Sequence, residues 1–306
     1  MKILVTGSGG FVGKHLVDEL RKRGHEVWGC DRHHDVGERY VRCDTAYYRQ
    51  VEHVLDEKSF EYVYHLAAEF GRWSGEEYYE NLWMSNVVGT KNVLRVQESL
   101  GFRLVFFSSS EVYGDWGGTM SESVMDEHEI KQLNDYALTK WVGELQVVNS
   151  AAAFGTESVR VRPFNLYGPG ERPSPYRSAL SRFIYHALFD EPYTVFGSHR
   201  RRWLYIDDAV EALANITEHF EPGEAYNIGS TEDVTTRELC DLVLQVCGKT
   251  DDLITYEEEE EMTTRTKNVD VSKAQRALGW TAQRRLAESL PPIVAWYRDL
   301  LKSDRS

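Results

Sequence analysis

The chain has 306 residues, of which 42% are hydrophobic and 27% are charged, and its formal net charge at pH 7 is −14. This composition is too apolar for a disordered chain and long enough for one large α/β unit or two fused domains. The negative charge excludes nucleic acids and anionic membranes as expected partners. Any anionic ligand must then be held by a few locally placed arginines.

Two further features bear on the compartment. The four cysteines show no CxxC pair and no metal-binding spacing, so we expect reduced thiols and no metal site; they are Cys30, Cys43, Cys240 and Cys247. No apolar run reaches the ~18 residues of a membrane helix, and the chain starts directly with a strand pattern. We therefore expect a cytoplasmic protein.

The first half of the chain alternates strand and helix patterns. Strands are predicted at 2–6, 26–30, 62–66, 104–107 and 158–162, and helices at 11–23, 78–100 and 133–153. Short β-rich runs separated by amphipathic helices favour a parallel sheet covered on both faces. Residues 1–164 are therefore predicted to form a Rossmann-type, doubly wound α/β domain.

The pattern changes after Asn165. A proline-rich loop, LYGPGERPSPY, precedes predicted helices at 178–189 and 235–248, the latter capped by Thr235 or Thr236. Between them RRRWLYIDDAVEALANI reads as a strand and a helix, and YEEEEE (256–261) reads as a solvated surface segment. We predict that 165–306 form a smaller substrate-binding α/β lobe, interleaved with the first domain, to which about 200–222 return.

A glycine-rich turn joins the first strand to the first helix. TGSGGFVG places Gly7, Gly10 and Gly13 where backbone N–H groups can meet a pyrophosphate at a helix N-terminus. Asp31 ends the second strand, 18 residues after Gly13, where a carboxylate can bind the adenine-ribose hydroxyls. This favours NAD over NADP, and the neighbouring Arg32 weakens that preference without reversing it.

Two further motifs carry groups suited to catalysis. SSSEVYG (108–114) places Ser109, Ser110 and Glu111 just after a buried strand, and NDYALTK places Tyr136 and Lys140 on one face of a helix. A lysine beside a phenol is expected to lower its pKa and make it a base near neutral pH.

With these motifs together, the chain resembles the extended short-chain dehydrogenases/reductases, in the NAD-dependent sugar-nucleotide epimerase/dehydratase group, over nearly its whole length. The resemblance implies catalytic roles for Tyr136, Lys140, Ser109, Ser110 and Glu111. It implies that NAD contacts Gly7, Gly10, Phe11, Val12, Gly13, Asp31, Arg32, Asp44, Thr45, Leu66, Ala67, Ala68, Asn86, Ser108, Tyr136, Lys140 and Pro163. It implies a nucleotide sugar held by Glu69, Asn165, Arg201 and Arg265.

The resemblance also implies a reaction. Tyr136, assisted by Ser109, would deprotonate the sugar 4-OH while NAD oxidises C4, and Glu111 stands where 4,6-dehydratases keep the base that attacks C5. We therefore expect an NDP-hexose 4,6-dehydratase type of lyase. Ser110 departs from the aspartic acid of dTDP-glucose dehydratases, and a Ser-Glu pair resembles UDP-glucuronate decarboxylases and GDP-mannose dehydratases.

Three alternatives accompany this expectation. A UDP-glucuronate decarboxylase would need a cation near the sugar carboxylate, for which Arg72 and Arg172 are both candidates. A 4-epimerase would need nothing beyond Ser109, Tyr136 and Lys140. A non-catalytic dinucleotide-binding protein is the remote alternative. Such proteins tend to lose the tyrosine or the lysine, whereas this chain has both Tyr136 and Lys140.

The resemblance further implies a homodimer in which the two long helices pair into a four-helix bundle. Apolar residues on these helices fit such an interface, and core packing would explain them equally well; they are Trp83, Val87, Leu94, Trp141 and Leu145.

Overall fold

The computed structural model describes residues 1–303, and its centre is a seven-stranded parallel sheet. The strand order is β12-β7-β5-β4-β1-β2-β3. The strands from β1 to β3 extend the sheet in one direction, and β4 and the later strands extend it in the other, so that the order of strand addition reverses between β1 and β4. The strands are β1 (Lys2–Thr6), β2 (Glu26–Asp31), β3 (Tyr40–Arg42), β4 (Tyr62–His65), β5 (Arg103–Phe107), β7 (Ser158–Pro163) and β12 (Ala225–Ile228). Such a reversal point is where Rossmann-type sheets bind ligands, at the carboxyl ends of the strands.

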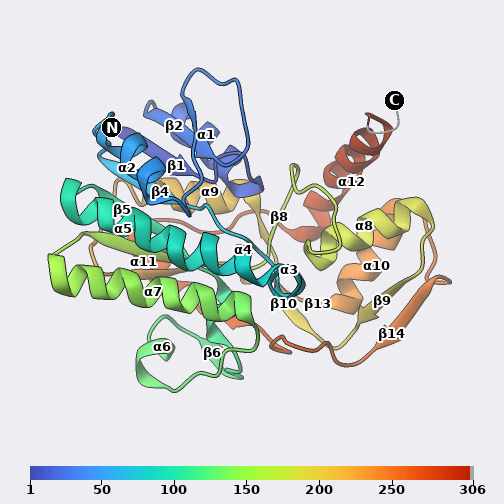
Figure 1. The fold of residues 1–306 in the computed structure, drawn as a ribbon. Coiled ribbons are helices and arrows are strands. Elements are labelled where there is room, and N and C mark those ends of the chain that lie inside the picture. Colours follow the sequence, from blue (N-terminus) through green and yellow to red (C-terminus); the bar gives the residue numbers. More distant parts are fainter. Residues whose placement is uncertain (304–306) are drawn as a thin grey trace.

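Helices cover both faces of this sheet (Figure 1). Alternate residues of β1 separate the two cores, since Ile3 and Val5 pack on one face and Leu4 on the other. The helices on the first face are α1 (Phe11–Lys22), α9 (Ile206–Asn215) and α11 (Ser272–Leu278), and those on the second are α2 (Tyr48–Asp56), α5 (Gly89–Leu100) and α7 (Asp135–Phe154). The fold is therefore the doubly wound α/β type that the sequence predicts. Beyond the expected range 200–222, β12 and α11 also return to this sheet.

The helix predicted at 78–100 is interrupted. It divides into α4 (Tyr79–Trp83), a π-helical turn (Met84–Val88) and α5, and it follows the short helix α3 (Arg72–Glu77). The π turn contains Asn86, which is buried and bonded outside its own helix. Single π turns within helices are frequent at functional sites, and the periodicity of the sequence does not reveal them.

The remaining elements form a smaller C-terminal lobe beside the sheet (Figure 1). Its core lies between α8 (Ala179–Phe189), α10 (Thr236–Cys247) and α12 (Leu286–Ser303). Thr235 caps α10 in a reciprocal capping box with Glu238, which confirms one of the two caps expected. Short strand pairs lie around this core: β8 (Leu166–Tyr167) with β11 (Leu204–Tyr205), β9 (Tyr193–Phe196) with β14 (Ile254–Glu257), and β10 (Arg200–Arg202) with β13 (Asp233–Thr235). A further pair, β6 (Thr119–Met120) with β15 (Asn268–Val269), packs in a separate apolar cluster.

Two general features complete the fold. Across residues 1–303, none of the helices combines the length and apolar character needed to span a bilayer. The shortest α-helix among them is α6 (Val124–Glu127). All four cysteines are buried free thiols.

Candidate active site

A cavity of about 530 Å³ opens at the carboxyl ends of the central strands. It is the natural place for a dinucleotide, since it follows the reversal point of the sheet. Most of the residues predicted to contact the cofactor line it: Gly7, Gly10, Phe11, Val12, Gly13, Asp31, Arg32, Asp44, Thr45, Leu66, Ala67, Ala68, Tyr136 and Lys140.

The glycine turn can accept a pyrophosphate because its close-packed backbone leaves no room for side chains, so none would block the phosphates. Gly7 has φ +69°, and a Cβ on it would lie 2.8 Å from the backbone nitrogen of Ala67. A Cβ on Gly13 would lie 2.2 Å from the carbonyl oxygen of Gly7. Only glycine fits either position, and the resulting bare backbone leads into the N-terminus of α1. The cavity therefore has the form that a dinucleotide requires.

Asp31 and Arg32 enter the cavity with different partners. The Asp31 carboxylate accepts a hydrogen bond from the backbone N–H of Gly9 (3.1 Å), which fixes it at the edge of the glycine turn. Arg32 instead forms an ion pair with Glu69 (2.6 Å). The charge of Arg32 is therefore already compensated, and Glu69, predicted to contact substrate, lies in the dinucleotide cavity.

Three residues of the predicted cofactor set do not line this cavity, and two of them support its walls. Asn86 accepts a hydrogen bond from the Glu69 N–H (2.8 Å) and donates one to the Glu69 carbonyl (3.0 Å). Ser108 donates to the buried carboxylate of Glu144 (2.5 Å). Pro163, the third, is the last residue of β7.

Tyr136 and Lys140 lie in the first two turns of α7, which begins after its N-cap, Asn134. Burial raises the pKa of the Tyr136 phenol to about 12, with the hydrogen bond of Ser109 acting in the opposite direction. Burial also lowers the pKa of Lys140 to about 8, and its ammonium donates to the carbonyl oxygen of Phe107 (2.9 Å). The raised phenol pKa differs from the sequence expectation: burial is its largest cause, and the charge of the nearby Glu111 carboxylate adds to the rise.

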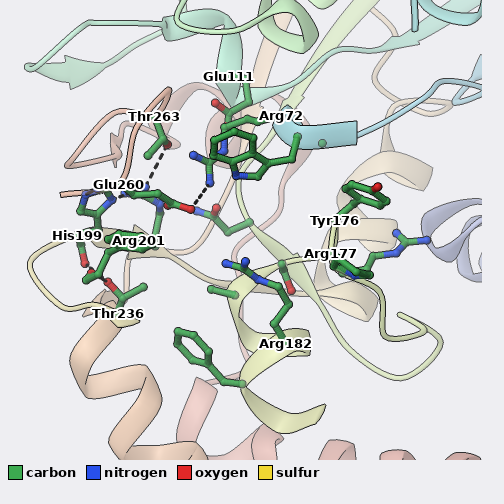
Figure 2. Close-up of a pocket in the computed structure, with 18 of the residues that line it drawn as sticks. Arg72, Glu111, Tyr176, Arg177, Arg182, His199, Arg201, Thr236, Glu260 and Thr263 are labelled. Carbon is green, nitrogen blue, oxygen red and sulfur yellow. Dashed lines mark hydrogen bonds and ion pairs between the residues drawn. The ribbon is translucent and has the colours of Figure 1, made fainter. Parts of the chain in front are cut away.

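A second, smaller cavity of about 190 Å³ lies between the sheet and the C-terminal lobe, and Tyr136 lines both cavities. Asn165 and Arg201 line it as predicted, together with Glu111. Further charged groups line it, as Figure 2 shows: Arg177 and His199, which the sequence offers as plausible pocket contacts, and Arg182 and Glu260, which it does not single out. Arg265 lines neither cavity, since its side chain is exposed and only its carbonyl oxygen contacts Arg201 (3.0 Å).

Glu111 has a partner that sequence reasoning missed. The ammonium of Lys267, only 2% exposed, forms an ion pair with the Glu111 carboxylate and lies 3.4 Å from the hydroxyl of Ser110. Burial alone would raise the pKa of Glu111, but the charge and hydrogen bond of Lys267 hold it below its usual value. Glu111 is thus a stable anion beside Ser109, whose hydroxyl accepts from the Glu111 N–H (3.2 Å).

Comparison with known proteins agrees with this geometry. The chain is 31% identical to UDP-glucuronic acid decarboxylase 6 of Arabidopsis thaliana, over 97% of this chain and 89% of that protein. Its fold matches MoeE5 in complex with UDP-glucuronic acid and NAD, with TM-score 0.87, 31% identity, and 98% and 100% of the two chains covered. It also matches UDP-glucuronic acid 4-epimerase from Bacillus cereus in complex with UDP-glucuronic acid and NAD, with TM-score 0.88, 26% identity, and 98% and 100% covered.

The model of one protein family, described as the NAD dependent epimerase/dehydratase family, matches residues 3–229, from β1 to the end of the seven-stranded sheet. That span contains the glycine turn, both serines beside Glu111, and the Tyr136–Lys140 pair. The chain therefore belongs to the NAD dependent epimerase/dehydratase family, and its cofactor is NAD.

Proposed function

We propose that this enzyme is a UDP-hexuronate decarboxylase that oxidises the sugar at C4 and then releases the C6 carboxylate as CO₂. The observation that carries the proposal is the buried ion pair of Glu111 with Lys267, at the end of a cavity rich in arginine. The relatives support the substrate class, because one is named as a UDP-glucuronic acid decarboxylase and two structures contain UDP-glucuronic acid.

The first step uses the groups at the junction of the two cavities. NAD supplies hydride transfer, first from C4 of the sugar and later back to the ring. Tyr136, as its phenolate, takes the proton of the 4-hydroxyl, and Ser109, which is hydrogen-bonded to the phenol, holds the oxygen in line through its own hydroxyl. Lys140 provides the positive charge that a phenolate needs in a buried place.

The state of Glu111 favours decarboxylation over loss of water. Elimination needs a base at C5 and an acid for the departing hydroxyl, whereas Lys267 depresses the pKa of Glu111 and Ser110 is no acid. A 4-keto hexuronate needs no base at C5: the C5–C6 bond breaks, its electrons move to the C4 oxygen, and CO₂ leaves. The resulting enolate then takes a proton at C5 before hydride returns to C4. We therefore set the 4,6-dehydratase expectation aside in favour of one of its alternatives.

The cavity also holds more cations than carboxylates. Of the two candidates in the sequence for a cation near the sugar carboxylate, Arg72 lines the substrate cavity with Glu111, whereas Arg172 lines neither cavity. Lys267 adds a second positive charge behind Glu111. This excess of cations on a chain of net charge −14 suits a substrate that carries a carboxylate besides its diphosphate.

Product mass tests the proposal. The purified enzyme with NAD is expected to convert UDP-glucuronic acid or its N-acetylated amino form to a product lighter by one CO₂, measured by mass spectrometry. The Tyr136→Phe variant is the control for contaminating activity. Loss of water from a UDP- or dTDP-hexose would contradict the proposal, and an unchanged mass with a shifted sugar NMR signal would identify the second candidate, a 4-epimerase.

We also infer a homodimer that pairs α4, α5 and α7 with their copies. Apolar side chains on the π-helical turn between α4 and α5, and on α7, are more than a third exposed: Met84 42%, Val88 38%, Leu145 43% and Val148 43%. Leu94, expected at this interface, is fully buried in the core and is not available to a partner. An exposed apolar strip along two adjacent helices is typical of a protein–protein interface.

Leu145→Glu combined with Val148→Asp is expected to halve the mass in analytical ultracentrifugation. The two charges on α7 could not be buried against α7 of the second protomer. Leu253→Glu is the matched control, since Leu253 is 44% exposed but lies on the C-terminal lobe. A wild-type protein that sediments as a monomer, or a double variant that still dimerises, would contradict this interface.

A further inference from the structure

The acidic run 256–261 is not the fully solvated segment that its composition suggests. Glu257, Glu258, Glu259 and Glu261 are exposed, but Glu260 turns inward and lines the substrate cavity. Its carboxylate forms an ion pair with Arg72 (2.9 Å), and both side chains are largely buried, at 13% and 18% exposure. Arg72 also donates to the carbonyl oxygen of Glu261 (2.9 Å). The start of α3 is thereby tied to the C-terminal segment across the cavity.

Arg201 faces the same space, and within the described residues 1–303 its side chain forms no ion pair with a carboxylate. The residue is 8% exposed, and in that part of the chain its guanidinium donates only to neutral acceptors: the carbonyl oxygens of Arg200 and Arg265, Nδ1 of His199 and the hydroxyl of Thr263. Burial lowers the pKa of Arg201 to about 10, and the charges of Glu111 and Glu260 oppose that change. A buried guanidinium with neutral partners alone retains much of its affinity for an anion.

Arg182, on α8, is less satisfied still. Throughout residues 1–303 no acceptor lies within hydrogen-bonding distance of its buried Nε, and its side chain forms no ion pair. Burial lowers the pKa of the Arg182 guanidinium. The negative charge of Glu260 raises this pKa, and the positive charge of Arg72 lowers it further. Arg72, Arg182 and Arg201 thus extend into one cavity (Figure 2), and the Glu260 carboxylate acts on all three. The Glu111 carboxylate also acts on Arg72 and Arg201.

The charges of this group do not balance. Three guanidiniums repel one another in a partly desolvated space, and Glu111, the other carboxylate nearby, is already paired with Lys267. A single carboxylate offers one negative charge, whereas a diphosphate offers two and enough oxygens for several guanidinium forks. The cavity is therefore a better match for a diphosphate than for the carboxylate that now lies in it.

We propose that Glu260 is an internal counter-ion that competes with the substrate for this three-arginine site. A nucleoside diphosphate displaces the Glu260 carboxylate from Arg72 and takes its place among the three arginines. Binding of the diphosphate breaks the Arg72–Glu260 ion pair between α3 and the acidic run. Diphosphate binding and the opening of this ion pair are therefore coupled. The proposal rests on the proposed function only for the nucleoside diphosphate and is independent of the sugar reaction.

Calorimetric titration of the NAD-loaded enzyme with UDP tests the proposal without any turnover. Glu260→Gln is expected to lower the dissociation constant of UDP by about tenfold, because one negative charge leaves the neighbourhood of the diphosphate. Glu259→Gln, an exposed neighbour in the same run, is the matched control and should leave the constant unchanged. Glu260→Gln should increase the affinity for UMP, which has a single phosphate, less than it increases the affinity for UDP.

Arg182→Gln provides a second measurement. Because the side chain of Arg182 makes no hydrogen bond or ion pair within residues 1–303, the fold should tolerate its replacement, yet UDP should bind about tenfold more weakly. Unchanged or weaker UDP binding in Glu260→Gln would overturn the competition and make Glu260 a support for Arg72. Unchanged binding in Arg182→Gln would overturn the three-arginine site. Neither outcome depends on whether the product has lost CO₂.

Discussion

Tyr136→Phe is expected to reduce kcat on the sugar nucleotide by about 10²- to 10⁴-fold, the range that one positioned acid–base group contributes. The phenol lies at the junction of the NAD and substrate cavities, and no other phenol lines both of them in residues 1–303. Phenylalanine keeps the ring and removes only the proton acceptor. KM and NAD affinity should therefore change little, which steady-state kinetics and calorimetry with NAD can measure.

Tyr176→Phe is the matched control for this variant. Tyr176 lines the substrate cavity but not the NAD cavity, and its hydroxyl bonds to Glu77 at the surface. It should retain most of the wild-type kcat. Turnover of Tyr136→Phe at the wild-type rate would remove Tyr136 from the reaction, and an equal loss in Tyr176→Phe would indicate general damage to the cavity.

Local sequence patterns predict the parts of the site that are built within one strand–helix unit. The glycine turn follows β1 directly, and Tyr136 and Lys140 are four residues apart on α7, so spacing alone places each set on one face. The capping box at Thr235 is likewise written in four consecutive residues. These features depend on neighbours in the chain, which is why they can be recognised without a structure.

The charged half of the substrate cavity has no such local signature. Lys267 meets Glu111 across 156 residues, and Arg72 meets Glu260 from the other lobe. Nothing in the run YEEEEE distinguishes the glutamate that turns inward from those that stay in water. Likewise, the pKa of Tyr136 depends on how much water the fold excludes, and the spacing to Lys140 does not report that quantity.

The support beneath the site leads to the largest expected effect on stability. Arg162 and Glu144 form a bidentate ion pair (2.9 and 2.7 Å) with exposures of 1% and 0%. Ser108 donates to the same carboxylate, so the pair ties β7 and α7 to the residue just before Ser109. Burial alone would raise the pKa of Glu144, but Arg162 and Ser108 hold it low.

Arg162→Met is expected to reduce the free energy of unfolding by about 3–5 kcal/mol, because it removes the bidentate partner of a buried carboxylate and leaves it with Ser108 and the more distant guanidinium of Arg160 (3.6 Å). In this variant the folded-state pKa of Glu144 should rise above its unfolded value. The deficit relative to wild type should therefore be smallest at pH values below the depressed folded-state pKa of wild-type Glu144, where the carboxyl is protonated in both proteins, and should grow toward neutral pH. Urea unfolding measured at several pH values provides the test.

The double variant Glu144→Leu/Arg162→Met separates the cost of a lone charge from the value of the pair. A buried pair is often matched or exceeded in stability by apolar residues of similar volume, so the double variant should recover more than half of the single variant's loss. Failure to recover would mean that the hydrogen bonds to Ser108 and Tyr113 carry the stability instead. Recovery of stability with a lowered kcat would show that the pair is retained for the position of Ser109 and Lys140, since both lie on segments that it joins.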